Sequence, residues 1–85
     1  MNQNLEALIS IKFGRGVTLD VPKLLQDIKN LNPNSIIWVR LAFGPDADAV
    51  AYVIAADQNA VANIAIQIAM TPGVGSTSTQ ILAQV

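Results

Sequence analysis

The chain has 85 residues, of which 52% are hydrophobic and only 13% are charged, and its net charge is −1. A domain of this size removes only about 60 to 65% of its unfolded surface from water when it folds alone, so one small core cannot hide all its apolar side chains. The absence of Cys and His excludes disulfides, thiolate nucleophiles, imidazole bases and the usual zinc and haem ligands, and we expect no cofactor.

The surplus of apolar residues needs either a membrane or other subunits. No run approaches the ~20 apolar residues that span a bilayer, because Asp48, Asp57, Asn63 and Gln67 interrupt the longest candidates. We therefore expect a homo-oligomer, with residues 1–85 as a single domain. The first six residues lack the basic region and apolar core of a secretory signal, so we expect a cytoplasmic protein.

The first half of the chain predicts a strand and then a helix. Residues 5–13 partly alternate apolar and polar side chains and end at a glycine-containing turn, which is typical of a strand. Thr18 or Asp20 can cap the next segment, and Pro22 suits the first turn of a helix. The predicted helix ends at residues 32–34, which contain a proline, and its inward stripe is Leu24, Leu25, Ile28 and Leu31.

A hairpin follows, with strands predicted over 35–43 and 48–56 and a turn over 44–47. Strict alternation would place Ile37, Val39, Leu41 and Phe43 on the helix-covered face. Ile36, Trp38, Arg40 and Ala42 would then share the opposite face. A Trp is costly to leave in water, and a second sheet stacked at about 10 Å would cover it.

The second predicted helix spans 58–71, with Asp57 as its cap. Val61, Ile64, Ala65 and Ile68 form its inward stripe. Its outer surface carries no charge and includes Ile66 and Met70, which suits a subunit interface, although the helix can also simply be poor in charge.

A final strand is expected within 75–82, after the Thr71-Pro72-Gly73-Val74 segment. The order strand, helix, strand, strand, helix, strand predicts an α+β, ferredoxin-like βαββαβ fold. Its four-stranded antiparallel sheet would carry both helices on one face.

Charge is unevenly distributed along the chain. All five cations lie in the first forty residues, whereas residues 41–85 carry only Asp46, Asp48 and Asp57. Either few charges are needed where subunits cover the surface, or the three carboxylates receive the ammonium group of a small ligand; the two interpretations are compatible.

Two segments carry a family resemblance. The pattern Gly73-Val74-x-x-Thr77-x-Thr79-x-Ile81 resembles the terminal loop and strand of the effector-binding (RAM-type) domain of the Lrp/AsnC transcription regulators. Residues 43–48, followed by an apolar strand that ends in Asp57, are similar to the central hairpin of that domain. The turn here reads Gly-x-x-x-Asp, one residue longer than the family's, so either Asp46 or Asp48 takes the position of the family's aspartate. The resemblance implies the ferredoxin-like fold, paired sheets that form a dimeric α/β barrel, and larger rings of dimers.

The resemblance also implies an amino-acid site between dimers. The candidate ligand-binding residues are Gly44, Asp46, Asp48, Asp57, Gly73, Val74, Thr77 and Thr79, and the candidate interface residues are Trp38, Arg40, Ile66 and Met70. Backbone N–H groups at glycines and threonine hydroxyls can bind a carboxylate, while an aspartate can pair with an ammonium. Each residue also has a plainer interpretation as a turn, cap or strand residue.

The sequence therefore favours a stand-alone module that senses a small molecule, most simply an amino acid, and modulates a transcription regulator. We expect no direct DNA binding, because the chain begins at the sensory domain and has five cations against six acids. One alternative is a structural protein that modulates oligomers without a ligand. Another is a cofactor-independent α/β-barrel enzyme, but no pair of side chains has the spacing of a nucleophile and base, so we expect no enzyme.

Overall fold

A computed structural model describes residues 4–15 and 18–82. The elements follow one another as β1 (Leu5–Phe13), α1 (Val21–Leu31), β2 (Ile36–Leu41), β3 (Ala49–Ala55), α2 (Gln58–Ala69) and β4 (Val74–Leu82). The four strands form one antiparallel sheet in the order β2-β3-β1-β4. This is the predicted ferredoxin-like arrangement.

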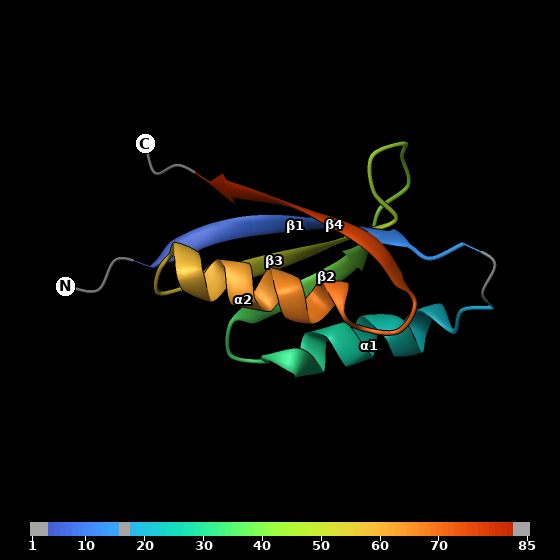
Figure 1. Ribbon diagram of the computed structural model, residues 1–85, viewed down its shortest axis with the longest axis horizontal. Coiled ribbons are helices and arrows are strands. Elements are labelled where there is room, and N and C mark those ends of the chain that lie inside the picture. Colours follow the sequence, from blue (N-terminus) through green and yellow to red (C-terminus); the bar gives the residue numbers. More distant parts are fainter. Residues whose placement is uncertain (1–3, 16–17, 83–85) are drawn as a thin grey trace.

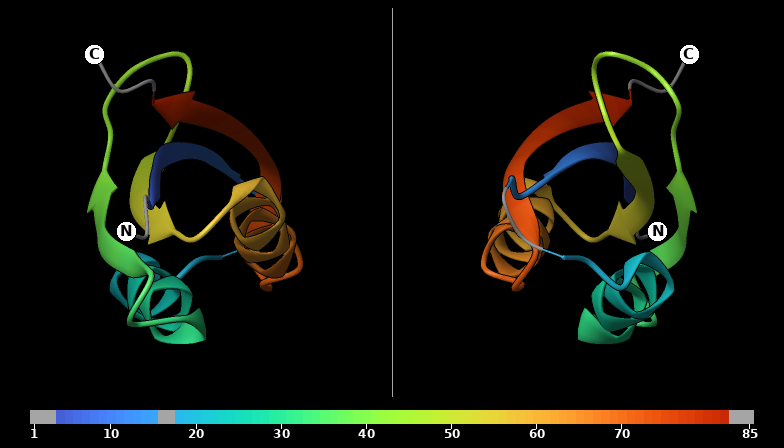
Figure 2. Two further views of the ribbon diagram at one scale, coloured as in Figure 1. Left: turned by 90° about the vertical axis from the view of Figure 1, so that its left-hand side faces the viewer. Right: turned by 90° about the vertical axis from the view of Figure 1, so that its right-hand side faces the viewer.

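Both helices lie on the same side of the sheet (Figure 1). Viewed along the strands, the sheet is arched, with α1 below β2 at one edge and α2 below β4 at the other (Figure 2). The opposite face of the sheet is covered by no other element among the described residues. The arch therefore has a filled inner side and an uncovered outer side.

The two helices begin where their capping residues predict. The Asp20 side chain accepts a hydrogen bond from the backbone N–H of Lys23, and Asp57 Oδ1 accepts one from Ala60 at 2.8 Å. These bonds satisfy N–H groups that have no partner inside the helix. Thr18, the other predicted cap of the first helix, lies outside it.

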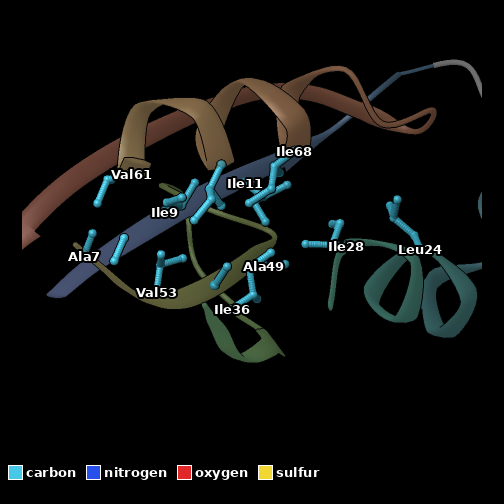
Figure 3. Close-up of a cluster of buried hydrophobic side chains, with 13 residues drawn as sticks. Ala7, Ile9, Ile11, Leu24, Ile28, Ile36, Ala49, Val53, Val61 and Ile68 are labelled. Atoms are coloured by element: carbon cyan, nitrogen blue, oxygen red, sulfur yellow. The ribbon is translucent and has the colours of Figure 1, made fainter. Parts of the chain in front are cut away.

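The core lies between the helices and the concave side of the sheet (Figure 3). Strand alternation supplies it with Ala7, Ile9 and Ile11 from β1 and the facing residues of β3, as expected for a period of two. The helices add Leu24 and Ile28 from α1 and Val61, Ile64 and Ile68 from α2. Leu31, expected in the stripe of the first helix, is 38% exposed.

Strand β2 departs from the predicted alternation. Its pairing with β3 shifts between Ile36 and Trp38, so Ile37 is an extra residue in a bulge. The prediction that Ile36 shares a face with Trp38 is therefore wrong, because the bulge turns Ile36 into the core, where it is fully buried. Ile37, expected on the covered face, is 42% exposed.

Phe43 is a second correction. β2 ends at Leu41, and the Phe43 side chain is 95% exposed in the connection to β3 rather than covered by a helix. The predicted hairpin strands were too long at the turn, since the connection runs from Ala42 to Asp48.

Candidate functional site

Asp48 fastens the β2–β3 connection to the end of β1. Its carboxylate Oδ2 accepts a hydrogen bond from the backbone N–H of Phe13 at 2.9 Å, and its own N–H donates to the Ile11 carbonyl at 2.8 Å. Its carbonyl in turn accepts from the Ala42 N–H at 3.0 Å. One residue thus joins three segments, and its carboxylate is held in a fixed position.

The loop before β4 arrives at the same end of β1. The Gly14 N–H donates to the Gly73 carbonyl at 2.8 Å, and Val74 pairs with Phe13. Gly73 has φ +99°, a left-handed conformation that L side chains rarely adopt. At Gly75 a Cβ atom would lie 3.0 Å from the Phe13 carbonyl oxygen, beside the irregularity in β1–β4 pairing, so the close approach of the two backbones requires glycine.

An open cavity of about 710 Å³ lies where the end of β1, the β2–β3 connection and the start of β4 meet. A smaller cavity, about 490 Å³, lies at the other end of the strands beside Leu5 and Asp57. We call the larger one the end cavity; its lining residues are Lys12, Phe13, Gly14, Arg15, Asp48, Gly75 and Ser76. Two cationic side chains and one carboxylate therefore border the same space. The Lys12 ammonium donates to the Pro45 carbonyl at 2.6 Å, which ties the connection to β1 as well.

This set of groups suits a small zwitterion. A guanidinium and an ammonium can bind a carboxylate, and a fixed aspartate can bind an ammonium. No hydrogen bond to Asp48 Oδ1 occurs within residues 4–15 and 18–82, so that oxygen can accept from a ligand. Across the described part of the chain, no three His, Cys, Asp or Glu side chains gather to hold a metal ion.

The structure brings together only some of the predicted ligand-binding residues. Asp48, Gly73 and Val74 meet at the end of β1, as described above. Gly44 and Asp46 lie in the exposed connection, which projects from the body of the molecule (Figure 1). A Cβ atom on Gly44 would meet nothing within 4 Å, so that glycine makes no close contact.

Asp57 is separate from this group. Asp48 precedes β3 and Asp57 follows it, so the two carboxylates lie at opposite ends of a strand of seven residues. Such a strand is about 20 Å long or more. The prediction that Asp57 converges with the other candidates is therefore wrong within one chain; its carboxylate caps α2 and borders the smaller cavity beside Leu5.

The two threonines lie along β4 rather than at its start. Thr77 pairs with Ile11 and Thr79 with Ile9. Thr79 also lines a groove of about 550 Å³ between β4 and α2, together with Ile66 and Ile81. Thr77 is thus nearer than Thr79 to the end cavity, but neither residue lines it.

Lys12, Arg15 and Ser76 line the end cavity but are not among the ligand-binding residues predicted from the sequence. More than thirty positions separate Lys12 from Asp48, so spacing along the chain does not bring the two side chains together. The available signal was the glycine turn after residue 13. An antiparallel strand that ends there brings its last residues beside the segment that starts the neighbouring strand.

The uncovered side of the sheet carries a second group of predicted residues. We call it the outer sheet face; its central residues are Glu6, Leu8, Ser10, Trp38, Arg40, Val50, Tyr52, Ile54, Ser78, Gln80 and Leu82. The Trp38 and Tyr52 rings stack with centroids 5.5 Å apart, and the Arg40 guanidinium lies 4.5 Å above the Trp38 ring. Trp38 and Arg40 thus share a face, as predicted.

Tyr52 also forms a hydrogen bond across the outer sheet face. Its hydroxyl donates to the Glu6 carboxylate, and this bond raises the pKa of Tyr52, with burial and the carboxylate charge adding to the effect. Ile66 in α2 and Met70 at its C-cap, the other predicted interface residues, are 56% and 78% exposed. No helix in the described part of the chain is long and apolar enough to cross a membrane.

No family model and no curated protein sequence matches this chain. Solved structures do match its fold. TTHA0845 from Thermus thermophilus is 24% identical with a TM-score of 0.77, and the match covers 95% of both chains. MtbAldR is 17% identical with a TM-score of 0.77, over 95% of this chain and 53% of that one.

An AsnC family transcriptional regulator from Agrobacterium tumefaciens is 12% identical with a TM-score of 0.70. That match covers 99% of this chain and 53% of the regulator. The chain thus spans about half the length of MtbAldR and of the AsnC family regulator. These likenesses show that the chain has the fold found in Lrp/AsnC-type regulators.

Proposed function

We propose that this chain is a binding module of the Lrp/AsnC type, which associates with copies of itself and holds a small zwitterion such as an α-amino acid in the end cavity. The observation that carries the proposal is the meeting of Lys12, Arg15 and a fixed Asp48 around one open space. The likeness in fold to an AsnC family regulator supports the same assignment.

The charges around the end cavity match the two ends of an amino acid. The cations of Lys12 and Arg15 would receive the carboxylate, and Asp48 would receive the ammonium. Asp48 also forms hydrogen bonds with Phe13 and Ile11. A ligand bound to its carboxylate would therefore affect the contact between β1 and the β2–β3 connection.

Self-association is the second part of the proposal. The outer sheet face presents Trp38, Tyr52 and Leu8 side by side, and a separate surface on the helical side of the molecule exposes Ile66 and Met70. Apolar patches of this kind on small proteins mark contact surfaces. The module would act alone or by joining oligomers of a full-length regulator, and with five cations against six acids it would not bind DNA by itself.

The ligand is tested by thermal melts with each common amino acid. At one hundred times its dissociation constant, a ligand that binds only the folded protein adds about 2.7 kcal/mol to stability, which a melt detects readily. Asp48→Asn should remove most of the shift, whereas Asp46→Asn, in the same connection, should keep it. If no amino acid raises the melting temperature, or if both variants respond like the parent, the ligand assignment is refuted.

Self-association is tested by sedimentation equilibrium at low micromolar concentration. The parent should be an oligomer, and Trp38→Lys should weaken assembly because it places a hydrated charge in a covered face. Phe43→Lys is the matched control, since Phe43 is 95% exposed and belongs to the β2–β3 connection rather than to a strand of the outer sheet face. A folded monomeric parent would refute this part of the proposal.

A further inference from the structure

The outer sheet face carries two opposite charges near its centre, Arg40 on β2 and Glu6 on β1. Neither is part of an ion pair in residues 4–15 and 18–82, where the salt bridge found joins Lys23 and Asp27 on α1. Both are nevertheless held in place. The Arg40 guanidinium lies 4.5 Å from the centre of the Trp38 ring, and Glu6 accepts a hydrogen bond from the Tyr52 hydroxyl. Charged groups that are positioned but unpaired on an apolar face suit a charged partner.

The strand register places these two charges symmetrically about Tyr52. On one side Tyr52 pairs with Trp38, and Arg40 lies two residues further along β2, opposite Val50. On the other side Tyr52 pairs with Leu8, and Glu6 lies two residues away in the opposite direction, opposite Ile54. With a strand spacing of about 4.8 Å and a rise of about 3.4 Å per residue, each charge is displaced about 8 Å from Tyr52, in opposite directions.

We propose that a second copy of this chain stacks on the outer sheet face about a two-fold axis that passes over Tyr52, so that Arg40 of each subunit pairs with Glu6 of the partner subunit. The inference rests on the self-association in the proposed function and adds the register of the contact. The axis runs between the two sheets, at a right angle to the line from Arg40 to Glu6 and over its midpoint. A rotation of 180° about it brings each of these residues over the other residue of the partner subunit, so one axis forms both ion pairs.

The same axis also matches the apolar side chains. It places Trp38 over the region of the partner's Ile54 and Leu8 over that of the partner's Val50, with the two Tyr52 residues together at the centre. With these spacings the strands of the two sheets would cross at about 70°, nearer to the orthogonal than to the aligned geometry of stacked sheets. Burying Arg40 or Glu6 without a partner would be costly, so the pairing also selects this register over others.

Charge reversal tests the pairing directly. In an Arg40→Glu homodimer, each introduced carboxylate would face Glu6 of the partner subunit, and in a Glu6→Arg homodimer each introduced guanidinium would face Arg40 of the partner subunit. Each variant alone should therefore dimerise about tenfold more weakly or worse. Mixing the two variants restores both pairs in the heterodimer, and the double variant restores them in its homodimer. Lys29→Glu on α1 is the control for the change of net charge in Arg40→Glu.

The measurement is the dimer dissociation constant from sedimentation equilibrium for each variant and for the mixture, with circular dichroism to confirm folding. The proposal expects the mixture and the double variant to come within about threefold of the parent, because opposite charges again face each other. If the parent dimerises but neither the mixture nor the double variant recovers, the Arg40–Glu6 pairing is wrong while self-association stands. If the parent is monomeric, both fail.

Discussion

Replacing Asp48 separates its structural role from its proposed ligand role. In the structure, Oδ2 of Asp48 accepts the Phe13 N–H at 2.9 Å in a half-buried position. Asn keeps a carbonyl oxygen that can accept the same hydrogen bond, whereas Ala removes the acceptor and leaves the N–H of Phe13 without this partner. The two variants should therefore differ in stability although both remove the charge.

The magnitude follows from that one bond. An unsatisfied, partly buried donor costs about 1 to 3 kcal/mol, so we expect Asp48→Ala to lose a free energy of unfolding in that range. Asp48→Asn exchanges a charge-assisted bond for a neutral one and should lose about 1 kcal/mol or less. For a domain of 60 to 100 residues each kcal/mol shifts the melting temperature by about 4 to 8 °C, so the difference is measurable.

Urea unfolding at one fixed protein concentration gives the two values, because the stability of a self-associating protein depends on its concentration. Without ligand, Asn should lie close to the parent and Ala well below it. With an amino acid that stabilises the parent, both variants should lose the response. Equal stability for Asn and Ala would show that the hydrogen bond to Phe13 does not hold this joint together.

Three further perturbations test other parts of the structure. Because the hydrogen bond to Glu6 raises the pKa of Tyr52 above its ordinary value, the folded protein holds this proton more tightly than the unfolded chain does. The resulting stability should be complete below about pH 10 and lost as the pH rises through the raised pKa; the free energy of unfolding of Tyr52→Phe should lack this dependence. Asp57→Ala should cost about 1 kcal/mol in a thermal melt through loss of the α2 cap, whereas Asp57→Asn should cost little and any amino-acid response should persist in both. Ile9→Ala, at a fully buried position, should cost about 2 to 5 kcal/mol in urea unfolding, and Phe43→Ala, at an exposed one, about 0.5 kcal/mol or less.

The order of the elements was predictable because local signals agree with the fold. Asp20 and Asp57 each precede an apolar helical stripe and each caps its helix, and the segment over 5–13 forms a strand with the predicted bounds. Helix capping and hydrophobic periodicity depend only on residues within one turn or one strand. A single sequence is therefore enough to predict them.

The side of the sheet to which each β2 side chain points was not predictable in the same way. Its bulge at Ile37 exists only in the pairing with β3, and nothing in the segment itself marks an extra residue. The bulge lets Ile36 reach the core while Trp38 and Arg40 stay on the outer sheet face. A pattern of strict alternation therefore assigns Trp38 correctly and Ile36 wrongly.

The candidate site depends on which strand ends lie side by side in the sheet. The C-terminal end of β1 lies beside the N-terminal ends of β3 and β4, because β1 pairs antiparallel with both strands. The residues that end β1, precede β3 and open β4 consequently meet there, which joins Lys12 and Arg15 to Asp48 and to the loop at Gly73. Asp57 follows β3 and so lies at the other end of the strands, where it lines a cavity together with Leu5 at the start of β1. Spacing along the chain cannot distinguish the two aspartates, but strand direction does, and it groups Asp48 rather than Asp57 with Lys12 and Arg15.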